Sequence, residues 1–360
     1  MNNTMETIRL GSLTVYPYGL YVAGGALLGL VYMLVRELRG HINKGTASWF
    51  AVLGIPLAFI FSRLGYVLVS LDWFQSEGLD KALRVTDGGL LFYGALAGIF
   101  LAGWITALVT KQKTGRVLDS TAVPCALLIA AARMGEPLVN IGIGRSIEEW
   151  FDPWNEMVFL IWKDPSPLYK YPFAVQNYYQ EWCFGIFFIE AAVAVLIALV
   201  LLLWRNRRPG TKALVFTTLY ASFQAVLESM RFDAVPRLGF VKFGDIDFGF
   251  SSVKDLGFVK VNQALALPIL LAVVTIAIVR TPRGKRRWWM PVYGYGTVLL
   301  QCGVIAAMEF AMDEKIELLQ WMRIDLIFIV MACAAFVMAA ATCRVIHKSD
   351  ISEPAPPASL

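Results

Sequence analysis

Apolar stretches of helical length alternate with short polar segments along almost the whole chain. A helix that crosses the hydrocarbon core of a bilayer needs about 20 mostly apolar residues. The chain has about nine stretches of this kind, near residues 16–35, 46–71, 89–110, 117–132, 181–204, 213–230, 263–279, 291–312 and 324–343. The pattern predicts an all-α polytopic membrane protein with a small extracytoplasmic loop region.

The polar segments between these stretches differ in charge. Lys and Arg gather in the segments after the first, third, fifth and seventh stretches, with Arg36, Arg39, Lys44, Lys111, Lys113, Arg116, Arg205, Arg207, Arg208, Lys212, Arg280, Arg283, Lys285, Arg286 and Arg287. The intervening segments mix acids with bases. Because basic loops remain in the cytoplasm, we predict that the N-terminus lies outside the cell and the C-terminus in the cytoplasm.

Composition supports a membrane protein and argues against a soluble or nucleic-acid-binding protein. Apolar residues make up 58% of the 360 residues and charged residues only 16%, and the mean hydropathy of +0.60 is too high for a soluble globular protein. The net charge of +5 is spread over several short basic loops without interleaved aromatics, so we expect no nucleic-acid partner. The first apolar stretch lacks a small-residue cleavage site and is expected to remain in the protein.

The segments predicted to lie outside include the two longest loops, 134–180 and 231–262, so we expect any chemistry to face outward. The polar, proline-containing tail at 346–360 is expected to be disordered. The five cysteines occur singly, and the two histidines, His41 and His347, lie in predicted cytoplasmic segments. We therefore expect no disulfide framework, no metal site and no histidine base.

An arginine at the end of an apolar stretch is the first candidate for function. In ALLIAAARMGEPLVNIGIGR, residues 126–145, the apolar run ends at Arg133, and a glycine-containing segment follows and ends at Arg145. A guanidinium at the edge of the hydrocarbon layer is costly unless it reaches water or meets an anion. Arg133 is thus a candidate contact for a phospholipid phosphate.

Other polar residues lie within or beside the apolar stretches. Taken one at a time, interfacial tyrosines and arginines near helix ends also occur for structural reasons. Glu190, deep in FFIEAAVAV, is equally compatible with a functional role and with structural pairing. The remaining embedded candidates are Tyr16, Tyr18, Arg63, Asp87, Tyr93, Glu228 and Arg231.

The order of several segments resembles the prolipoprotein diacylglyceryl transferase family of bacterial inner-membrane enzymes. These segments are YPYGL, SRLGYVL, DGGLLFYGALAG, ARMGEPLVNIGIGR, VLESMRFD and NQALALPILLA. The resemblance covers roughly residues 8–280 and implies a seven-helix transmembrane core there. Residues 281–345 would then form a two-helix C-terminal extension, and 346–360 the cytoplasmic tail.

The resemblance also implies an activity. The family moves the diacylglyceryl group of phosphatidylglycerol onto the lipobox cysteine thiol of a preprolipoprotein, releases glycerol phosphate and leaves a thioether. Such a site must deprotonate a thiol with a reference pKa of about 8.5, hold the lipid carbon in line and stabilise the departing phosphate. No metal or cofactor is required. The partners implied are phosphatidylglycerol, the lipobox segment and the bilayer.

Motif positions carry the family's roles to individual residues. Catalytic roles are implied for Tyr18, Tyr93, Glu136 and Glu228, and phosphate binding by the guanidinium of Arg133. Glu228 and Arg231 match the Glu-Phe-x-Arg element, and Gln263 and Pro268 match Gly-Gln-x-x-Ser-x-Pro. The full set of residues implied to bind phospholipid is Arg63, Asp87, Arg133, Gly135, Gly144, Arg145 and Arg231.

The chain also departs from the family's motifs at positions that touch the chemistry. Tyr93 replaces the histidine of Phe-His-Gly, and Glu136 replaces an asparagine after Arg-x-Gly. Ile141 occupies the place of a glutamate, with Asn140 beside it. Gln224 replaces a second phosphate-binding arginine.

These departures leave three hypotheses. In the first, the chain is a divergent transferase whose base is Glu136, or Tyr93 with a pKa lowered by Arg133; Glu136 could instead form only an i,i+3 salt bridge with Arg133. In the second, the chain binds phospholipid or a lipoprotein precursor without transfer. In the third, it transfers from another lipid donor. The last two spans, with Gln301, Glu309 and Arg323, either dock a partner, cover the lipid entrance or extend the fold.

Overall fold

The computed structural model describes most of the chain. The described residues are 8–10, 13–71, 74–75, 78–83, 89–139, 141–144, 146–147, 170–177, 179–231, 237–238, 256–312 and 324–351. Within them the fold is dominated by long helices, with short 3-10 turns and three small antiparallel sheets, which confirms the predicted all-α membrane class.

Within the described residues, nine long helices occupy the nine predicted apolar stretches. They are α1 (Pro17–Leu38), α2 (Thr46–Val69), α4 (Phe92–Val109), α5 (Thr114–Gly135), α8 (Ile186–Leu203), α9 (Thr211–Met230), α10 (Val261–Arg280), α11 (Trp289–Met312) and α12 (Ile324–Ile351). Among the described residues, eight helices are long and apolar enough to span a bilayer, and α9 is the exception. The chain is a multi-pass membrane protein.

Helix α9 tolerates its polar side chains because other helices surround it. It contacts α5, α8, α10 and α12, and most of its residues are buried, including Thr218, Ser222, Gln224 and Glu228. A helix that hardly touches lipid does not need an apolar surface, since its polar groups can find partners inside the bundle. α9 therefore forms the polar centre of the membrane domain.

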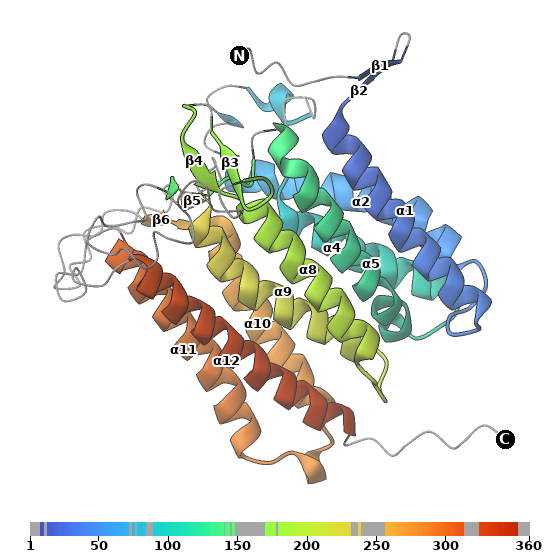
Figure 1. Cartoon of the computed structure of the whole chain (residues 1–360). Coiled ribbons are helices and arrows are strands. Elements are labelled where there is room, and N and C mark those ends of the chain that lie inside the picture. Colours follow the sequence, from blue (N-terminus) through green and yellow to red (C-terminus); the bar gives the residue numbers. More distant parts are fainter. Residues whose placement is uncertain are drawn as a thin grey trace.

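The bundle consists of two packed groups of helices (Figure 1). In the N-terminal group, α2 packs along α4, and α1 packs along α5. In the C-terminal group, α9 contacts α10 and α12, and α11 packs along α12. Helix α5 joins the groups because it also contacts α8 and α9.

Glycines allow the closest helix contact in the N-terminal group. A Cβ added to Gly94 of α4 would lie 2.4 Å from the carbonyl oxygen of Phe61, and one added to Gly98 would lie 2.3 Å from that of Leu57. Both positions face the backbone of α2, as small-xxx-small pairs do in membrane helices. The GALAG segment of the third stretch thus packs helices.

Three short sheets lie at one end of the bundle, which we call the strand end (Figure 1). The antiparallel pairs are β1 (Ile8–Leu10) with β2 (Leu13–Val15), β3 (Ala174–Gln176) with β4 (Trp182–Phe184), and β5 (Arg237–Leu238) with β6 (Leu256–Lys260). The 3-10 turns η1 (Leu79–Leu83), η3 (Glu136–Val139) and η4 (Arg283–Lys285) complete the described elements. The sequence pattern did not predict these strands.

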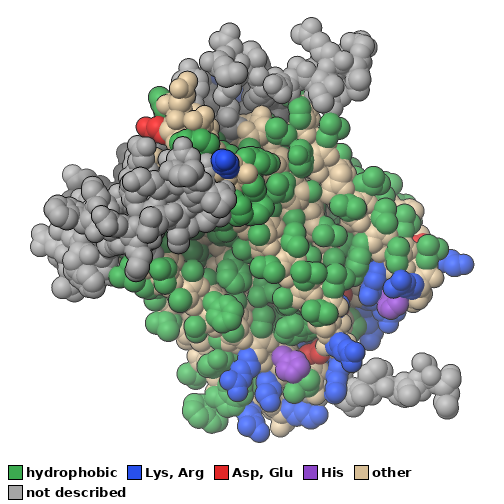
Figure 2. Space-filling view, viewed as in Figure 1, with side chains coloured by type: hydrophobic (Ala, Val, Ile, Leu, Met, Phe, Trp, Pro, Cys, Tyr) green, Lys and Arg blue, Asp and Glu red, His purple; other side chains and the backbone are tan. Residues whose placement is uncertain are grey.

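Side-chain types divide the surface into zones (Figure 2). Lys, Arg and His side chains gather at the end opposite the strands, which we call the basic end. An apolar band lies between the two ends, with exposed Leu27, Val52, Leu196 and Val292 among its residues. Such a band fits contact with lipid tails.

The C-terminal segment corrects one prediction. Helix α12 continues to Ile351, so residues 346–351 are helical rather than part of a disordered tail. Ile346 is buried, and the Asp350 carboxylate accepts hydrogen bonds from the backbone nitrogens of Arg207 at 2.9 Å and Arg208 at 2.7 Å. These contacts anchor the last turn to the loop before α9. Residues 352–360 lie outside the described residues.

Candidate active site

Two arginines and two glutamates form a closed ring of ion pairs at the strand end. Arg133 pairs with Glu136 and places its Nε 3.2 Å from Oε2 of Glu190. Arg231 donates from Nη1 to the same oxygen of Glu190 at 2.9 Å and places Nη2 3.4 Å from Oε2 of Glu136. Each guanidinium therefore contacts both carboxylates. We call these four residues the ion-pair ring.

Four elements bring the ring together. Arg133 lies in the last turn of α5, Glu136 begins η3, Glu190 lies in the first turns of α8, and Arg231 caps the C-terminus of α9. All four residues are buried. Buried charges are costly unless they are paired and hydrogen-bonded, and the closed arrangement meets that need.

Glycine at position 142 leaves space for the carboxylate of Glu136. Gly142 has a φ of +75°, which disfavours any other residue. A Cβ at this position would also lie 2.4 Å from Oε2 of Glu136 and 2.8 Å from the Cβ of Phe187. The glycine-containing segment after Arg133 is thus needed for the ring to close.

One face of α9 extends the ring into the bundle. Tyr220, Gln224 and Glu228 follow each other at intervals of four and lie on this face. Gln224 donates from Nε2 to Oε1 of Glu190 at 3.1 Å and to Oε2 of Glu228 at 2.6 Å, while Nη2 of Arg133 lies 3.4 Å from the Tyr220 hydroxyl. At position 224, where the sequence suggested a lost arginine, the Gln224 amide therefore links the carboxylates of Glu190 and Glu228.

A cavity of about 260 Å³ reaches the ring from the side of α1 and α4. Its polar wall contains Tyr18, Ser62, Arg133 and Glu136. The rest of its lining is mainly apolar and includes Val22, Leu90, Phe92, Ala95, Leu96, Ile99, Leu128, Ile129 and Ala132. The cavity can thus hold a molecule with one charged end and a long apolar part.

Gly135 allows Tyr18 to approach this cavity. A Cβ at Gly135 would lie 2.9 Å from the Cβ of Tyr21 and 3.1 Å from Cδ2 of Tyr18. Gly135 thus allows a close packing contact with α1, and its role in lipid binding stays a prediction. Tyr18 itself lines the cavity beside Arg133 and Glu136.

A second cavity, of about 350 Å³, lies between α1, α2 and α5 and has an almost wholly apolar lining. It shares Ile99, Cys125 and Leu128 with the first cavity, so the two cavities adjoin. Gly25, Gly29 and Gly54 line its wall. Gly25 and Gly29 also let α1 approach α5, because added Cβ atoms would lie 2.8 Å from the Cβ of Ala131 and 2.9 Å from the Cβ of Pro124. Together the cavities provide one polar end and two apolar spaces.

Tyr93 lies beside the site and makes no polar contact there. Its side chain is buried on α4, next to Phe92, which packs against Tyr220 at a ring distance of 4.6 Å. Among the described residues its hydroxyl has no hydrogen-bond partner. Tyr93 therefore lies outside the ion-pair ring.

Arg63 lies away from the ring and holds a loop. Its guanidinium donates to the carbonyl oxygens of Ala82 at 2.9 Å, Gly89 at 3.0 Å and Lys81 at 2.9 Å, and its charge faces the rings of Tyr66 and Phe74. These contacts favour a structural role over the predicted lipid contact.

Gly144 supports the site through its backbone. It forms a β-bridge with Arg231, and its nitrogen donates to the carbonyl oxygen of Phe184 at 2.8 Å. Asp87 and Arg145, for which lipid binding was predicted, lie outside the described residues, as do Asn140 and Arg323.

A second polar network joins the C-terminal helices to the site. Oε1 of Glu309, on α11, accepts hydrogen bonds from Nε2 of Gln263 at 2.6 Å and from the Ser229 hydroxyl. Oε1 of Gln263 accepts from the backbone nitrogen of Lys260 at 3.0 Å, and Nζ of Lys260 donates to the carbonyl oxygens of Glu228 and Arg231. The predicted extension is thus connected to the end of α9.

Sequence reasoning missed Tyr220 and Lys260. The spacing of Tyr220 from Gln224 and Glu228, two turns of one helix face, was a usable signal. Lys260, directly before an apolar stretch and on the predicted outer side, where basic residues are not favoured, was another signal. Among the described residues, no three His, Cys, Asp or Glu side chains are placed to hold a metal ion together.

Comparison with known proteins assigns the chain to one family. A family model described as prolipoprotein diacylglyceryl transferase matches residues 6–279. A phosphatidylglycerol–prolipoprotein diacylglyceryl transferase of Bacillus licheniformis is 28% identical over 243 residues, 65% of this chain and 85% of the relative. The enzyme of Cupriavidus necator is 27% identical over 286 residues, 75% and 90% of the two chains. That of Listeria monocytogenes is 25% identical over 285 residues, 79% and 92%. The chain therefore belongs to the prolipoprotein diacylglyceryl transferase family.

Proposed function

We propose that this protein transfers the diacylglyceryl group of phosphatidylglycerol to the lipobox cysteine of a preprolipoprotein. Family membership supports the reaction type. The observation that carries the proposal to this chain is the cavity in which Tyr18, Arg133 and Glu136 form the polar end of an otherwise mainly apolar lining. A phospholipid has the matching distribution of charge and apolar surface.

The two adjoining cavities suit the two acyl chains of the donor. The phosphate would lie at Arg133, where a guanidinium can donate two parallel hydrogen bonds to phosphate oxygens. The acyl chains would extend into the apolar parts of the cavities, between α1, α2, α4 and α5. This placement holds the glycerol carbon near Glu136.

The reaction breaks one bond and forms another. The cysteine thiol loses its proton to a base, and its sulfur attacks the glycerol carbon that bears the phosphate. A carbon–sulfur bond forms, the carbon–oxygen bond to phosphate breaks, and glycerol phosphate leaves with the bonding electron pair. Arg133 would stabilise the charge that grows on the leaving oxygen, and Glu136 would take the thiol proton.

The ion-pair ring links lipid binding to the availability of the base. In the ring, the Glu136 carboxylate is engaged with both arginines, which stabilise its charge. A phosphate arriving at Arg133 would replace Glu136 as the partner of that guanidinium. The carboxylate would then be free to accept the thiol proton. Its Oε2 would keep the contact with Nη2 of Arg231, which lies 3.4 Å away in the ring.

The charge distribution supports a location in the bacterial inner membrane with the ion-pair ring outside. Basic residues gather at the opposite end of the bundle (Figure 2), and basic ends face the cytoplasm. Helix α1 starts at the strand end and α12 finishes at the basic end (Figure 1). The N-terminus would then lie outside and the C-terminus inside, where a secreted lipobox segment meets the site from outside.

Genetic rescue tests this proposal. In a bacterium depleted of its own transferase, expression of this chain should restore lipoprotein modification, seen as a mobility shift of a reporter lipoprotein and incorporation of labelled acyl chains. Membrane insertion is checked by immunoblot of the membrane fraction. Absence of modification despite normal insertion would contradict the proposal.

A second function is favoured by one feature of the ring. Both arginines are already neutralised by carboxylates, and Gln224 takes the place of a further cation. Such a site could bind phospholipid or a lipoprotein precursor without transfer. Binding of phosphatidylglycerol to the purified protein without any product would establish this function instead. Transfer from phosphatidylethanolamine alone would indicate another donor.

Replacing Glu136 by glutamine is expected to lower the transfer rate by about 100-fold or more, since a general base contributes roughly 10²–10⁴-fold. The amide keeps hydrogen-bonding capacity toward Arg133 but cannot take a proton. The measurement is transfer from phosphatidylglycerol to a lipobox peptide in micelles, with the apparent KM for the lipid determined separately. Undiminished turnover would remove Glu136 from the role of base.

The C-terminal helices are expected to support the site rather than to form a separate module. Glu309→Ala should lower turnover by about tenfold, because Gln263 and Ser229 lose their shared acceptor and the ends of α9 and α10 loosen. Glu309→Gln, which keeps one acceptor oxygen, should recover much of the activity. Equal activity of the alanine variant and the parent protein would leave α11 with a purely peripheral role.

A further inference from the structure

Four arginines surround a small cavity at the basic end, far along the bundle from the ion-pair ring. The cavity has a volume of about 220 Å³. Arg36 comes from the end of α1, Arg116 from the start of α5, and Arg207 and Arg208 from the loop before α9. The remaining lining residues are His41, Asp119, Asn206 and Pro209. Three separate segments thus direct positive charge to one space.

The carboxylate in this cavity is committed to the protein backbone. Asp119 accepts hydrogen bonds from Nδ2 of Asn206 at 2.8 Å and from the backbone nitrogens of Gly210 at 2.8 Å and Ala213 at 3.1 Å. These contacts cap the N-terminus of α9, where a negative charge is favoured. Asp119 therefore offsets only part of the surrounding positive charge.

The nearby carboxylate of α12 is used in the same way. Asp350 accepts from the backbone nitrogens of Arg207 and Arg208, and from the Thr211 hydroxyl at 2.9 Å. It binds the backbone of the loop and leaves the arginine side chains to other partners. Asp119 thus lines the cavity and Asp350 holds the backbone of the adjoining loop, and among the described residues neither forms an ion pair with the four arginines.

The guanidinium groups of Arg36, Arg116 and Arg207 make no ion pair with any carboxylate among the described residues. Nε of Arg36 is buried and has no hydrogen-bond partner there. A buried donor without a partner destabilises the protein. An anion in the cavity would satisfy it and would neutralise the adjacent charges.

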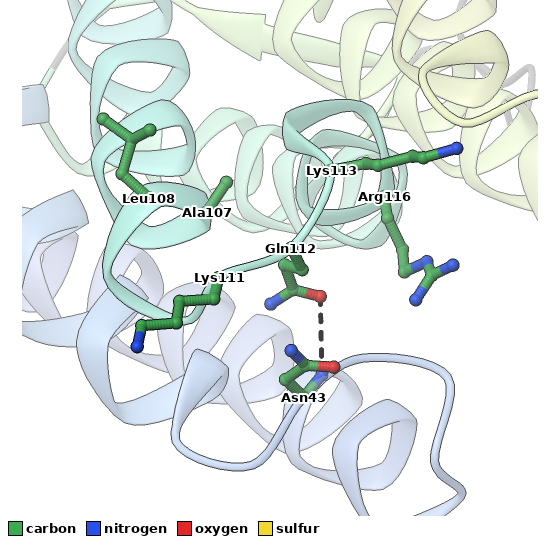
Figure 3. A pocket seen from close by; sticks show the side chains of 7 residues that line it. All are labelled: Asn43, Ala107, Leu108, Lys111, Gln112, Lys113 and Arg116. Carbon is green, nitrogen blue, oxygen red and sulfur yellow. Dashed lines mark hydrogen bonds between the residues drawn. The ribbon is translucent and has the colours of Figure 1, made fainter.

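A second cavity at the basic end, lined by Lys111, Lys113 and Arg116 among others, has a different arrangement of basic side chains. In Figure 3, Lys111 points away from Arg116, and the backbone nitrogen of Asn43 donates a hydrogen bond to Oε1 of Gln112 at 3.4 Å. Lys113 and Arg116 point away from that amide pair. This cavity has dispersed lysines, whereas the other has several arginines around one space.

We propose that the cavity bounded by Arg36, Arg116, Arg207 and Arg208 binds a phosphate-bearing anion. Guanidinium groups from several segments can donate paired hydrogen bonds to phosphate oxygens. Leu38, two residues after Arg36 at the end of α1, is exposed. The end of an apolar helix surface is where lipid head groups are found. The phosphate would come from an anionic lipid of the same leaflet or from solution. This site is independent of the proposed transfer reaction.

Binding is tested with the full chain in phosphatidylcholine nanodiscs. Inorganic phosphate is titrated in one arm, and phosphatidic acid is added to the nanodisc in the other, with thermal unfolding and native mass spectrometry as readouts. The Arg36→Gln/Arg116→Gln variant should weaken binding at least tenfold. The control, Arg39→Gln/Lys111→Gln, removes the same charge from exposed residues at the same end and should stay within about twofold of the parent protein.

The two arms distinguish the sources of phosphate. Binding of phosphatidic acid alone indicates a lipid head group, and binding of inorganic phosphate indicates a dissolved anion; either supports the site. Both arms are repeated with the Arg133→Ala variant, in which phosphate binding at the ion-pair ring is removed. Equal loss in the two double variants would show a general surface-charge effect and overturn the proposal, as would absence of binding in both arms. If the double variant does not fold, Arg36→Lys, which keeps the charge and loses the paired donors, replaces it.

Discussion

Replacing Arg133 by alanine is expected to abolish rescue and to lower transfer by at least about 100-fold, the usual cost of losing one group that stabilises transition-state charge. Arg133 is the arginine that lines the cavity, and it also pairs with Glu136 and Glu190. Its removal takes away the proposed phosphate contact and leaves two carboxylates with fewer partners. No other described arginine lines that cavity.

The measurement compares Arg133→Ala and Arg133→Lys in proteoliposomes that contain phosphatidylglycerol and a lipobox peptide. Lysine keeps the charge but cannot donate two parallel hydrogen bonds, so its activity should lie between those of the alanine variant and the parent protein. Arg283→Ala, at an exposed position of the basic end, is the control and should retain activity. Full activity of Arg133→Ala in folded protein would refute the assignment of the phosphate site.

Replacing Glu190 by glutamine is expected to destabilise the protein by about 3–5 kcal/mol, the cost of leaving a buried charge without its partner. Oε2 of Glu190 contacts both arginines of the ring, and the residue is only 3% exposed. After the substitution, one carboxylate, Glu136, must neutralise two guanidinium groups. The free energy of unfolding in detergent is the quantity to measure.

A double variant separates this electrostatic effect from simple loss of packing. Glu190→Gln/Arg231→Gln removes one charge of each sign, so it should be more stable than the sum of the two single substitutions predicts. Glutamine has nearly the volume of glutamate, which limits packing changes. If Glu190→Gln is as stable as the parent protein, the ring does not depend on the Glu190 charge.

The ring also explains how the chain accommodates departures from its family's motifs. Gln224 does not leave a gap, because its amide links Glu190 and Glu228. Glu136 is compatible with burial because Arg133 and Arg231 both contact it. The substitutions are therefore parts of one connected arrangement, and a single reversion such as Gln224→Arg would add a charge to a network that is already paired.

The sequence by itself determined the membrane class and the positions of the helices. Long apolar segments are sufficient for this, because every backbone polar group inside a bilayer must be satisfied within a helix. Motif order also led to the family and to Tyr18, Arg133, Glu136, Glu228 and Arg231. These are local properties of the chain, so they are visible without coordinates.

Only the tertiary structure decided which polar groups meet. Glu136 and Arg133 are neighbours in sequence, but Glu190 and Arg231 reach them from α8 and α9. The same long-range packing bound the side chain of Arg63 to a loop, joined Glu309 to Gln263, and continued α12 through residues that composition suggested were disordered. Partners of buried charges depend on which helices lie side by side, and hydrophobic periodicity shows which face is apolar without naming its neighbour.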